Sequence, residues 1–319
     1  MSAIQPSKLK VLSFNAGLLY IKLSPLPIII FENPPHGKDR LKHIPQAIRD
    51  EGADIVLLQE FYYEQDATFI IESLKDIFPF VSRQDCCRSC IQLHNGLLLL
   101  SKFPVVKESL ETFKNASKIE RIFACKSFLT TAIQFGPSVL TFVQGHSTAG
   151  GEADPEHPAT DVCRHTELQQ MLRAATVAAE LGEIPILCGD FNCGPEASKG
   201  NYDFIVQSGY RDLFLESAAL QGLPSSGSDT FTWSPENYLN TVGPHAHCPG
   251  QRVDHLFLAN SQVGIECLQS RIVFRTACVA LPNGIVSTLS DHNGITWELS
   301  FSSFTAACGD DKWKQVETC

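Results

Sequence analysis

Carboxylate, amide and imidazole side chains recur in this chain at the ends of short apolar runs. They are Asn15, Glu60, His146, Asp190, Asn192, Asp254, Asp291 and His292. Asn15 follows "LKVLSF" (9–14), for example, whereas Asp291 and His292 come just before "GITWELSF" (294–301). If the ends of these runs share one edge of the fold, the side chains converge there.

The acids and amides of this set are all oxygen ligands. Glu60, Asp190, Asn192 and Asn15 suit a hard cation such as Mg²⁺ better than zinc, which is typically bound by His and Cys. In an extended segment Asp190 and Asn192 point to the same side, because strand side chains repeat every two residues. The carboxylate would then hold a metal ion or a water molecule while the amide donates to a phosphoryl oxygen.

A histidine beside an acid adds proton transfer to this set. The group therefore offers what hydrolysis of a phosphate ester needs: charge neutralisation, an oriented nucleophile and a proton carrier. Singly, these residues also have ordinary explanations as turn residues, solvated strand ends, loop caps or acceptors for backbone N–H groups. Their joint order, each beside its own apolar run, favours the functional interpretation.

The other histidines have no such placement and are expected to be structural. They are His36, His43, His94, His157, His165, His245, His247 and His255.

The apolar runs have strand length and are rich in β-branched and large apolar residues. Helical patterns lie between them at 40–52, 66–78 and 161–182, and Gly52 and Gly182 are placed to end two of these helices. The turn "GPSV" (136–139) predicts a hairpin, which does not fit a purely parallel sheet. Two mixed sheets packed face to face, with helices outside and strand ends along one rim, fit the pattern as a single domain.

Composition and charge narrow the function classes. The chain has 319 residues, of which 44% are hydrophobic and 19% charged, so a sizeable core is expected. The net charge of −10 gives no general attraction to nucleic acid, and a phosphate substrate would need a metal ion or local cations. The start of the chain, 1–10, lacks an export pattern, which favours a cytoplasmic protein with reduced thiols.

Two segments leave alternatives open. The cysteines of "CCRSC" (Cys86, Cys87 and Cys90) could form a zinc site or be ordinary thiols, because no second Cys/His pair follows at a suitable spacing. The apolar stretch 18–31 is too short to span a bilayer. It could be tucked into the core, or it could be a flap that dips into a membrane interface.

The fragments "SFNAG", "LLQE", "GDFN", "RVDH" and "LSDH", in this order, resemble the endonuclease/exonuclease/phosphatase superfamily. The resemblance covers residues 9–301. It implies an α/β fold, a four-layered α/β sandwich of two packed mixed β-sheets flanked by helices, with Mg²⁺ at one rim. The implied catalytic domain is 9–302, with tails at 1–8 and 303–319.

Within that superfamily the chain looks most like the neutral sphingomyelinases. The stretches that carry this resemblance are "NGLLLLSKFPV" (95–105), "QGHSTAGGEADPEH" (144–157) and "DTFTWSPENYLN" (229–240), the last followed by "GQRVDHLFL" (250–258). "GDFNCGP" is also similar to the deadenylases, so that branch stays open.

The resemblance implies a role for each residue of the set. Glu60 would be the principal Mg²⁺ ligand, with Asn15 beside it and Asp291 polarising the site. Asp190 and Asn192 would position the attacking water and a phosphate oxygen. His292 would be the general base, oriented by Asp254, and His146 would contact the phosphate.

Two further residues are implied as substrate-binding. Trp233 belongs to the stretch 229–240. Lys126 matches a lysine that the sphingomyelinases place after an aspartate, but here Arg121 stands five positions earlier. An ordinary lysine at a strand remains the alternative for Lys126.

The predicted function is that of a Mg²⁺-dependent phosphodiesterase that cleaves sphingomyelin, or a related choline phospholipid, to ceramide and phosphocholine. The protein would act at a membrane surface as a cytoplasmic, peripheral protein, with no nucleic-acid partner. The alternatives are a nuclease or 3′ deadenylase of the same superfamily and a catalytically silent member that binds lipid or protein. Oligomeric state is not indicated by the sequence.

Overall fold

The protein was analysed as a computed structural model that describes residues 7–23, 28–84, 93–115, 125–150, 157–241 and 245–302. Cys86, Cys87 and Cys90, Arg121, the middle of the apolar stretch (24–27) and the segments 1–6 and 303–319 lie outside the described residues.

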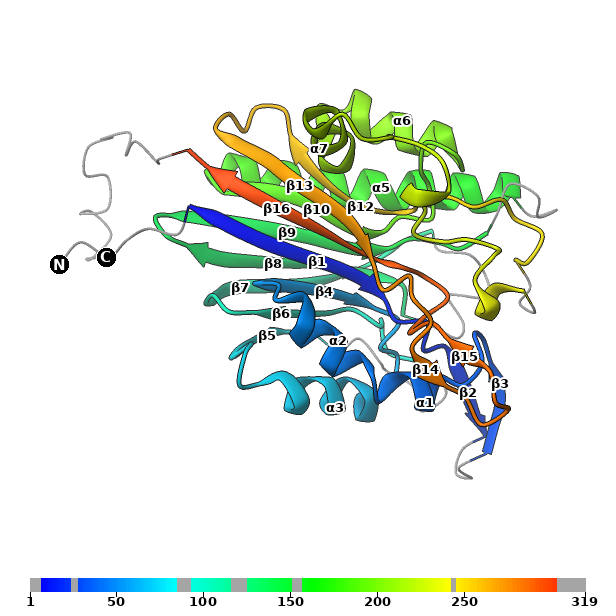
Figure 1. Ribbon diagram of the computed structural model, residues 1–319. Coiled ribbons are helices and arrows are strands. Elements are labelled where there is room, and N and C mark those ends of the chain that lie inside the picture. Colours follow the sequence, from blue (N-terminus) through cyan, green and yellow to red (C-terminus); the bar gives the residue numbers. More distant parts are fainter. Residues whose placement is uncertain are drawn as a thin grey trace, which may run out of the picture.

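Two six-stranded mixed sheets pack face to face (Figure 1). The first sheet has the order β13 (Ile265–Val273), β16 (Gly294–Phe301), β1 (Lys8–Asn15), β4 (Ile55–Gln59), β6 (Leu98–Ser101) and β5 (Phe80–Ser82). The second has the order β11 (Tyr210–Asp212), β12 (Asp254–Ala259), β10 (Ile184–Asp190), β9 (Ser138–His146), β8 (Ser127–Phe135) and β7 (Val105–Thr112). Two small ladders are added, β2 (Tyr20–Leu23) with β3 (Ile28–Glu32) and β14 (Val279–Ala280) with β15 (Val286–Ser287).

Helices cover the outer face of each sheet, which confirms the predicted four-layered sandwich (Figure 1). On the first sheet lie α1 (Gly37–Leu41), α2 (Ile44–Glu51) and α3 (Glu64–Leu74). On the second lie α5 (His157–Glu180), α6 (Lys199–Gln207) and α7 (Leu213–Gln221). Short 3₁₀ turns occur at Ser228–Thr230 and Tyr238–Asn240.

Strands that are buried on both faces explain why the sequence shows continuous apolar runs. Val11 of β1 points into the core between the two sheets, where it shares a cluster with Ile186 of β10. Leu12, the next residue, points outward and packs in the cluster that includes Ile48 of α2. Successive side chains of a strand point to opposite faces, so both neighbours must be apolar when both faces are covered.

The helix predicted over 40–52 is two helices. Pro45 stands at the start of α2, where a missing backbone N–H is tolerated, and it separates α2 from α1. Gly52 ends α2 in the left-handed conformation with φ +66°, as predicted. Gly182 likewise follows α5 with φ +77°.

Strand direction brings the predicted site residues to one edge. β1 runs parallel to β4, and β9 runs parallel to β10, so Asn15 and His146 lie at the carboxyl ends of their strands beside Gln59 and Asp190. The antiparallel neighbours begin at that same edge: Asp254 opens β12 opposite Asp190. The predicted convergence therefore follows from the ladders.

Gly189 permits the close approach of β10 to β9 just before this edge. Its φ is +119°, and a Cβ atom at this position would lie 2.1 Å from the carbonyl oxygen of Gly145. Only glycine combines that backbone conformation with that contact. The "CGD" segment thus delivers Asp190 to the edge through a position that bears no side chain.

We expect Gly189→Ala to destabilise the fold by about 2–4 kcal/mol, since it adds a steric clash to a strained backbone. The free energy of unfolding, measured by urea denaturation, checks this. Gly200→Ala is the matched control, because Gly200 lies in α6 with open space around its Cβ position. An unchanged unfolding midpoint for Gly189→Ala would contradict the proposed packing.

Candidate functional site

The site lies where the two sheets meet at the strand-end edge. Asn15 from the first sheet directs its amide Nδ2 at two carboxylates, Glu60 Oε1 at 3.2 Å and Asp190 Oδ2 at 3.0 Å. Its Oδ1 atom accepts a hydrogen bond from the Gly17 backbone N–H at 3.0 Å. Asn15 thus joins an acid of its own sheet to an acid of the opposite sheet.

His292 lies between two acids of the second sheet. Its Nδ1 atom is 3.0 Å from Asp254 Oδ2, and its Nε2 atom is 3.7 Å from Asp190 Oδ2. A proton on Nδ1 directed at Asp254 leaves Nε2 as the atom that exchanges protons with the cavity. Asp254 is itself held by Thr232 Oγ1, which accepts hydrogen bonds from the Val253 and Asp254 backbone N–H groups at 3.0 and 3.2 Å.

Burial and mutual repulsion shift the pKa values of the clustered acids upward. Burial, followed by the charge of Asp291, raises the pKa of Glu60 to about 7. Burial, followed by the charge of Asp254, raises the pKa of Asp190 to about 6. Burial opposes the charged form of His292, but Asp254 and Asp190 outweigh it and hold the pKa of this imidazole well above its ordinary value. The cluster therefore favours bound positive charge.

His146 approaches the same acids from β9. Its Nε2 atom lies 3.7 Å from Asp190 Oδ2 and 3.9 Å from Glu60 Oε1, and Tyr62 Oη lies 3.4 Å from Nδ1. Burial, with the charges of Lys126 and His292, holds the pKa of His146 well below its ordinary value. A neutral imidazole at this position can donate or accept a hydrogen bond at a phosphate.

Lys126 is buried behind His146. Its ammonium group donates to the carbonyl oxygens of His146 and Ser147 at 3.2 and 3.0 Å. These contacts hold the end of β9, and a direct contact between Lys126 and a substrate stays a prediction.

Glu60 and Asn192 both adopt the left-handed backbone conformation, with φ +68° and +48°. This conformation is costly for glutamate, whereas asparagine adopts it more readily than most residues, and costly backbone conformations are concentrated at functional positions. The Asn192 side chain donates to the Ser147 carbonyl at 3.1 Å, while its backbone N–H donates to Asp190 Oδ1 at 2.9 Å. In these backbone conformations the Glu60 carboxylate and the Asn192 amide line the same cavity.

The remaining predicted residues lie at the rim of the cavity. Asp291 Oδ1 accepts from the Ser290 hydroxyl at 2.9 Å, and the Asp291 carbonyl accepts from the Asn240 side chain at 2.9 Å. Trp233 is buried, and its backbone forms isolated bridges to Gln251 and His292. All predicted residues except Asn15, Asp254 and Lys126 line the cavity, and Asn15 and Asp254 contact residues that do.

Other lining residues were not predicted as part of the site. They are Leu19, Asn33, Ala149, Gly150, His245, Cys248, Gln251 and Val253. His245, expected to be only structural, therefore lies at the cavity wall. These residues come from loops, and no periodic pattern in the sequence marks them.

The donor set fits a divalent cation. Asp190, Asp254 and His292 offer ligand atoms within 4.8 Å of one another, and Glu60 Oε1 lies close by across the Asn15 amide. Asp254 Oδ1 is buried and has no hydrogen-bond partner among the described residues, which leaves one carboxylate oxygen available. Carboxylate oxygens suit Mg²⁺ and Mn²⁺, whereas His292 as a direct ligand would favour a softer ion.

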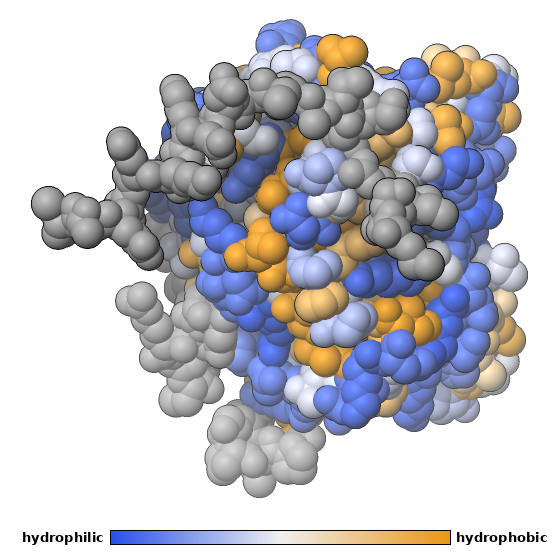
Figure 2. All heavy atoms as spheres, turned by 90° about the vertical axis from the view of Figure 1, so that its left-hand side faces the viewer, coloured by the Kyte–Doolittle hydropathy of each residue, from blue (hydrophilic) through white to orange (hydrophobic). Residues whose placement is uncertain are grey.

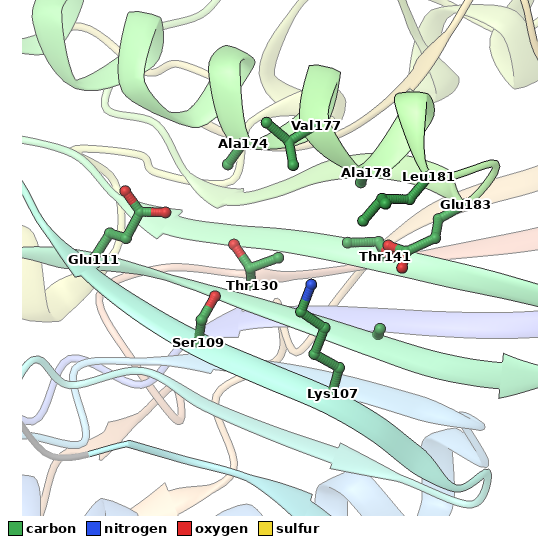
Figure 3. A pocket seen from close by; sticks show the side chains of 11 residues that line it. Lys107, Ser109, Glu111, Thr130, Thr141, Ala174, Val177, Ala178, Leu181 and Glu183 are labelled. Carbon is green, nitrogen blue, oxygen red and sulfur yellow. Dashed lines mark hydrogen bonds between the residues drawn. The ribbon is translucent and has the colours of Figure 1, made fainter. Parts of the chain in front are cut away.

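A second groove lies between α5 and the outer face of β7, β8 and β9 (Figure 3). The helix contributes Ala174, Val177 and Ala178, and Leu181 follows directly after it, while the Lys107 ammonium group points from β7 toward the helix. Thr141 Oγ1 donates to Glu183 Oε2 at 2.5 Å. No acid–histidine pair lines this groove, so the strand-end cavity is the candidate site.

A buried ionic network supports the start of β12 from behind. Arg252 donates to Asp212 Oδ2 at 2.8 Å and lies 2.7 Å from His255 Nδ1. Because Arg252 can only donate, His255 accepts at Nδ1 and donates from Nε2 to the Cys193 carbonyl at 2.9 Å. The network joins β11, β12 and the loop after Asp190.

The network also shifts the pKa of Asp212. Burial opposes the charged form of Asp212, but the attraction of Arg252 is stronger than this effect and holds the pKa of the Asp212 carboxyl well below its usual value.

This network predicts a pH-dependent loss of stability. A carboxyl whose pKa is lowered by folding stabilises the fold above its unfolded pKa of about 3.9, and this stabilisation is lost as the pH falls. We expect Asp212→Asn to cost about 3–5 kcal/mol at pH 7, as for other broken buried pairs, and progressively less below about pH 4. Urea unfolding of both proteins between pH 7 and pH 3 measures the difference.

Asp76→Asn is the control for this measurement. Asp76 pairs with Arg49 at 2.7 Å on the surface, so its replacement should change stability little at any pH. A wild-type advantage over Asp212→Asn that stays constant down to pH 3 would contradict the assigned charge state of Asp212.

No helix among the described residues is long and apolar enough to cross a membrane.

Comparisons with known proteins identify the family and show the shared fold. The sequence model of the Endonuclease/Exonuclease/phosphatase family matches residues 12–292 of this chain. Human "Sphingomyelin phosphodiesterase 2" is 25% identical over 240 residues, which cover 73% of this chain and 54% of that protein. The chain thus spans about half the length of this curated relative.

Solved structures share the fold. Sphingomyelinase C from Streptomyces griseocarneus matches with a TM-score of 0.68 and 18% identity, over 92% of this chain and 99% of that chain. TDP2 from D. rerio, complexed with a single-strand DNA product, matches with a TM-score of 0.64 and 15% identity, over 92% of this chain and 100% of that chain.

Proposed function

The chain belongs to the Endonuclease/Exonuclease/phosphatase family, and we propose that within this family it is a Mg²⁺-dependent phosphodiesterase that hydrolyses sphingomyelin or a related choline phospholipid. The products would be ceramide and phosphocholine. The observation that carries the proposal is the alignment of Asp254, His292 and Asp190 beside Glu60 at one cavity. The similarity to human sphingomyelin phosphodiesterase 2 supports the choice of substrate.

His292 is the proposed general base. A water molecule between His292 Nε2 and Asp190 would attack phosphorus, a new P–O bond would form, and the bond from phosphorus to the ceramide oxygen would break. The ceramide oxygen would leave with the electron pair of that bond and take a proton from solvent water. The water proton passes to Nε2, while Asp254 at Nδ1 fixes the tautomer and stabilises the imidazolium. Asn192 and His146 would donate hydrogen bonds to the phosphoryl oxygens.

Glu60 and Asp190 would hold the metal ion, with Asn15 and Asp291 beside them. Bound there, Mg²⁺ would neutralise phosphate charge and offset the carboxylates, so that His292 enters the reaction as the free base.

The charge of the cavity wall bears on whether the substrate is a polyanionic chain or a single phosphodiester. Among the described residues, no Lys or Arg lines the cavity. Lys126 and Arg40, the nearby buried cations, donate to main-chain carbonyls. A polyanionic backbone typically needs several cationic contacts, whereas one zwitterionic phosphodiester does not. A nuclease remains the second candidate, because TDP2 bound to single-strand DNA shares the fold.

The β2–β3 hairpin offers a surface for a lipid interface. Ile28, Ile30 and Phe31 of β3 are about half exposed, and the hairpin is flanked by Leu19 and Asn33, which line the cavity. Hydrophobic surface also occurs at the opposite end of the sandwich (Figure 2), so exposure alone is not decisive. The position of this hairpin beside the cavity supports the proposal of a cytoplasmic protein that acts peripherally on membranes.

The first test is hydrolysis of sphingomyelin in mixed micelles with and without Mg²⁺. We expect Mg²⁺-dependent release of phosphocholine, reduced about 10²–10⁴-fold in His292→Ala because the general base is lost. His165→Ala, a histidine that contacts Asn201 beneath α6, is the matched control and should remain close to wild type.

Single-stranded RNA and DNA oligonucleotides are assayed in parallel. Cleavage of an oligonucleotide with the lipid untouched would transfer the protein to the nuclease branch. A protein that turns over none of these substrates but binds sphingomyelin vesicles would be a silent lipid-binding member.

The hairpin is tested separately. Ile30→Asp should weaken binding to sphingomyelin vesicles about 10–100-fold, because one buried isoleucine contributes about 1.5–3 kcal/mol. Hydrolysis of a monomeric, water-soluble choline phosphodiester should be unchanged. Val263→Asp applies the same substitution to a residue that is 93% exposed beyond the far end of β12. Equal vesicle binding by both variants would contradict a specific role of the hairpin.

A further inference from the structure

Arg40, in the short helix α1, is fully buried, and its hydrogen-bond acceptors within the described part of the chain are all main-chain carbonyls. Nη1 donates to Ala16 at 3.0 Å and to Leu289 at 2.9 Å. Nη2 donates to Gly17 at 2.5 Å and to Pro34 at 3.3 Å, and Nε donates to Pro35 at 3.1 Å. A guanidinium group has five N–H donors in a fixed plane, so the donor capacity of Arg40 is fully used.

These carbonyls belong to three segments that are far apart in the sequence. Ala16 and Gly17 directly follow Asn15 at the end of β1. Leu289 lies two residues before Asp291, ahead of β16. Pro34 and Pro35 follow β3 and adjoin Asn33 at the cavity. One side chain therefore sets the spacing of the two loops that carry Asn15 and Asp291, and it fixes both to the base of the apolar hairpin.

The loop at Gly17 and the Asp291 side chain are in direct contact. A Cβ atom on Gly17 would lie 2.2 Å from Asp291 Oδ1, so the position of Gly17 limits where this carboxylate can stand. Gly17 also donates its N–H to Asn15 Oδ1, which orients the amide toward Glu60 and Asp190. A shift of the loop held by Arg40 would therefore move both groups.

The charge of Arg40 acts on the same side of the site. Among the described residues, no carboxylate forms an ion pair with Arg40, and the acids that act on its charge are Asp291, Glu32 and Glu60. The buried guanidinium therefore places positive charge on the side of the site where Asp291 and Glu60 lie.

We propose that Arg40 is a positioning residue for divalent-cation binding: its planar guanidinium holds the Asn15 and Asp291 loops at the spacing that the ion requires. It does not touch the substrate. The inference rests on the proposed function only in that the cavity binds a divalent cation. Residues that orient metal ligands through a second contact typically change metal affinity about 10–100-fold when replaced.

The test is calorimetric titration of the full chain with Mn²⁺, a probe that does not depend on turnover. Arg40→Lys keeps the charge but has three donors on a flexible stem, and Arg40→Gln keeps a planar donor group without the charge. We expect the dissociation constant for Mn²⁺ to rise about 10–100-fold in Arg40→Lys. The titration stoichiometry reports the folded fraction, so that partial unfolding does not disguise the affinity.

Arg164→Lys is the matched control. Arg164 is equally buried and donates to the carbonyls of Thr148 and Gly150 at 3.0 and 3.1 Å, on the other side of the cavity. Its replacement should lower the thermal unfolding midpoint while the Mn²⁺ dissociation constant stays near wild type. Rescue supplies a second readout: methylguanidinium, but not methylammonium, should restore Mn²⁺ affinity to Arg40→Gly.

The outcomes separate the two proposals. Wild-type Mn²⁺ affinity in Arg40→Lys would overturn the role of Arg40 and leave the proposed function standing. Equal loss of affinity in Arg164→Lys, or failure of both Arg40→Lys and Arg40→Gln to fold, would make the role of Arg40 one of general stability and overturn the inference. A wild-type protein that binds no Mn²⁺ or Mg²⁺ would instead remove the metal site of the proposed function.

Discussion

The hydrogen bonds that cross from one sheet to the other at the strand-end edge determine the rest of the site. Asn15 reaches Asp190, and His292 reaches Asp254, whereas the interior between the sheets is mostly apolar. Its polar contacts include Gln144 Nε2, which donates to the Leu58 carbonyl at 2.8 Å. An apolar interface alone tolerates sliding, but buried polar groups are costly when they lack partners. The two sheets therefore have one relative position in which both pairs form. That position also brings the acids and histidines of separate strands into one cavity.

Much of this arrangement is predictable from the sequence, because it depends on strand direction. Apolar runs on both sides of the "GPSV" turn predict a hairpin, and β8 and β9 form it. The rim follows from the parallel pairs: once β9 and β10 run together, His146 and Asp190 must end side by side. The fold class was predicted correctly for this reason. The catalytic and ligand roles of the residues at the rim stay predictions, since proximity alone does not assign a role.

Other features depend on contacts between loops, which no periodicity encodes. Arg40 stands in a segment predicted as one long helix. Pro45 is a sequence signal for the break in that helix, but the five carbonyl acceptors of Arg40 could not be anticipated from its neighbours in the sequence. His245 reaches the cavity from the segment that precedes Cys248. In the sequence, Gly189 merely interrupts the apolar run that begins at Ile184. The need for glycine at position 189 comes from the close contact with Gly145, which lies 44 positions earlier in the chain.

Several features of the site lower the stability of the fold. Glu60 adopts a backbone conformation that is unfavourable for its residue type, and Glu60 and Asp190 have raised pKa values because they are buried near other acids. Each raised pKa means that the ionised acid is less stable in the folded chain than in water. The apolar clusters on both sides of the two sheets supply the stability that offsets this cost. A bound divalent cation would remove the repulsion, and any ligand that binds only the folded state stabilises it. Metal affinity and fold stability are therefore coupled through the same carboxylates, and the residues that hold those carboxylates apart act on both.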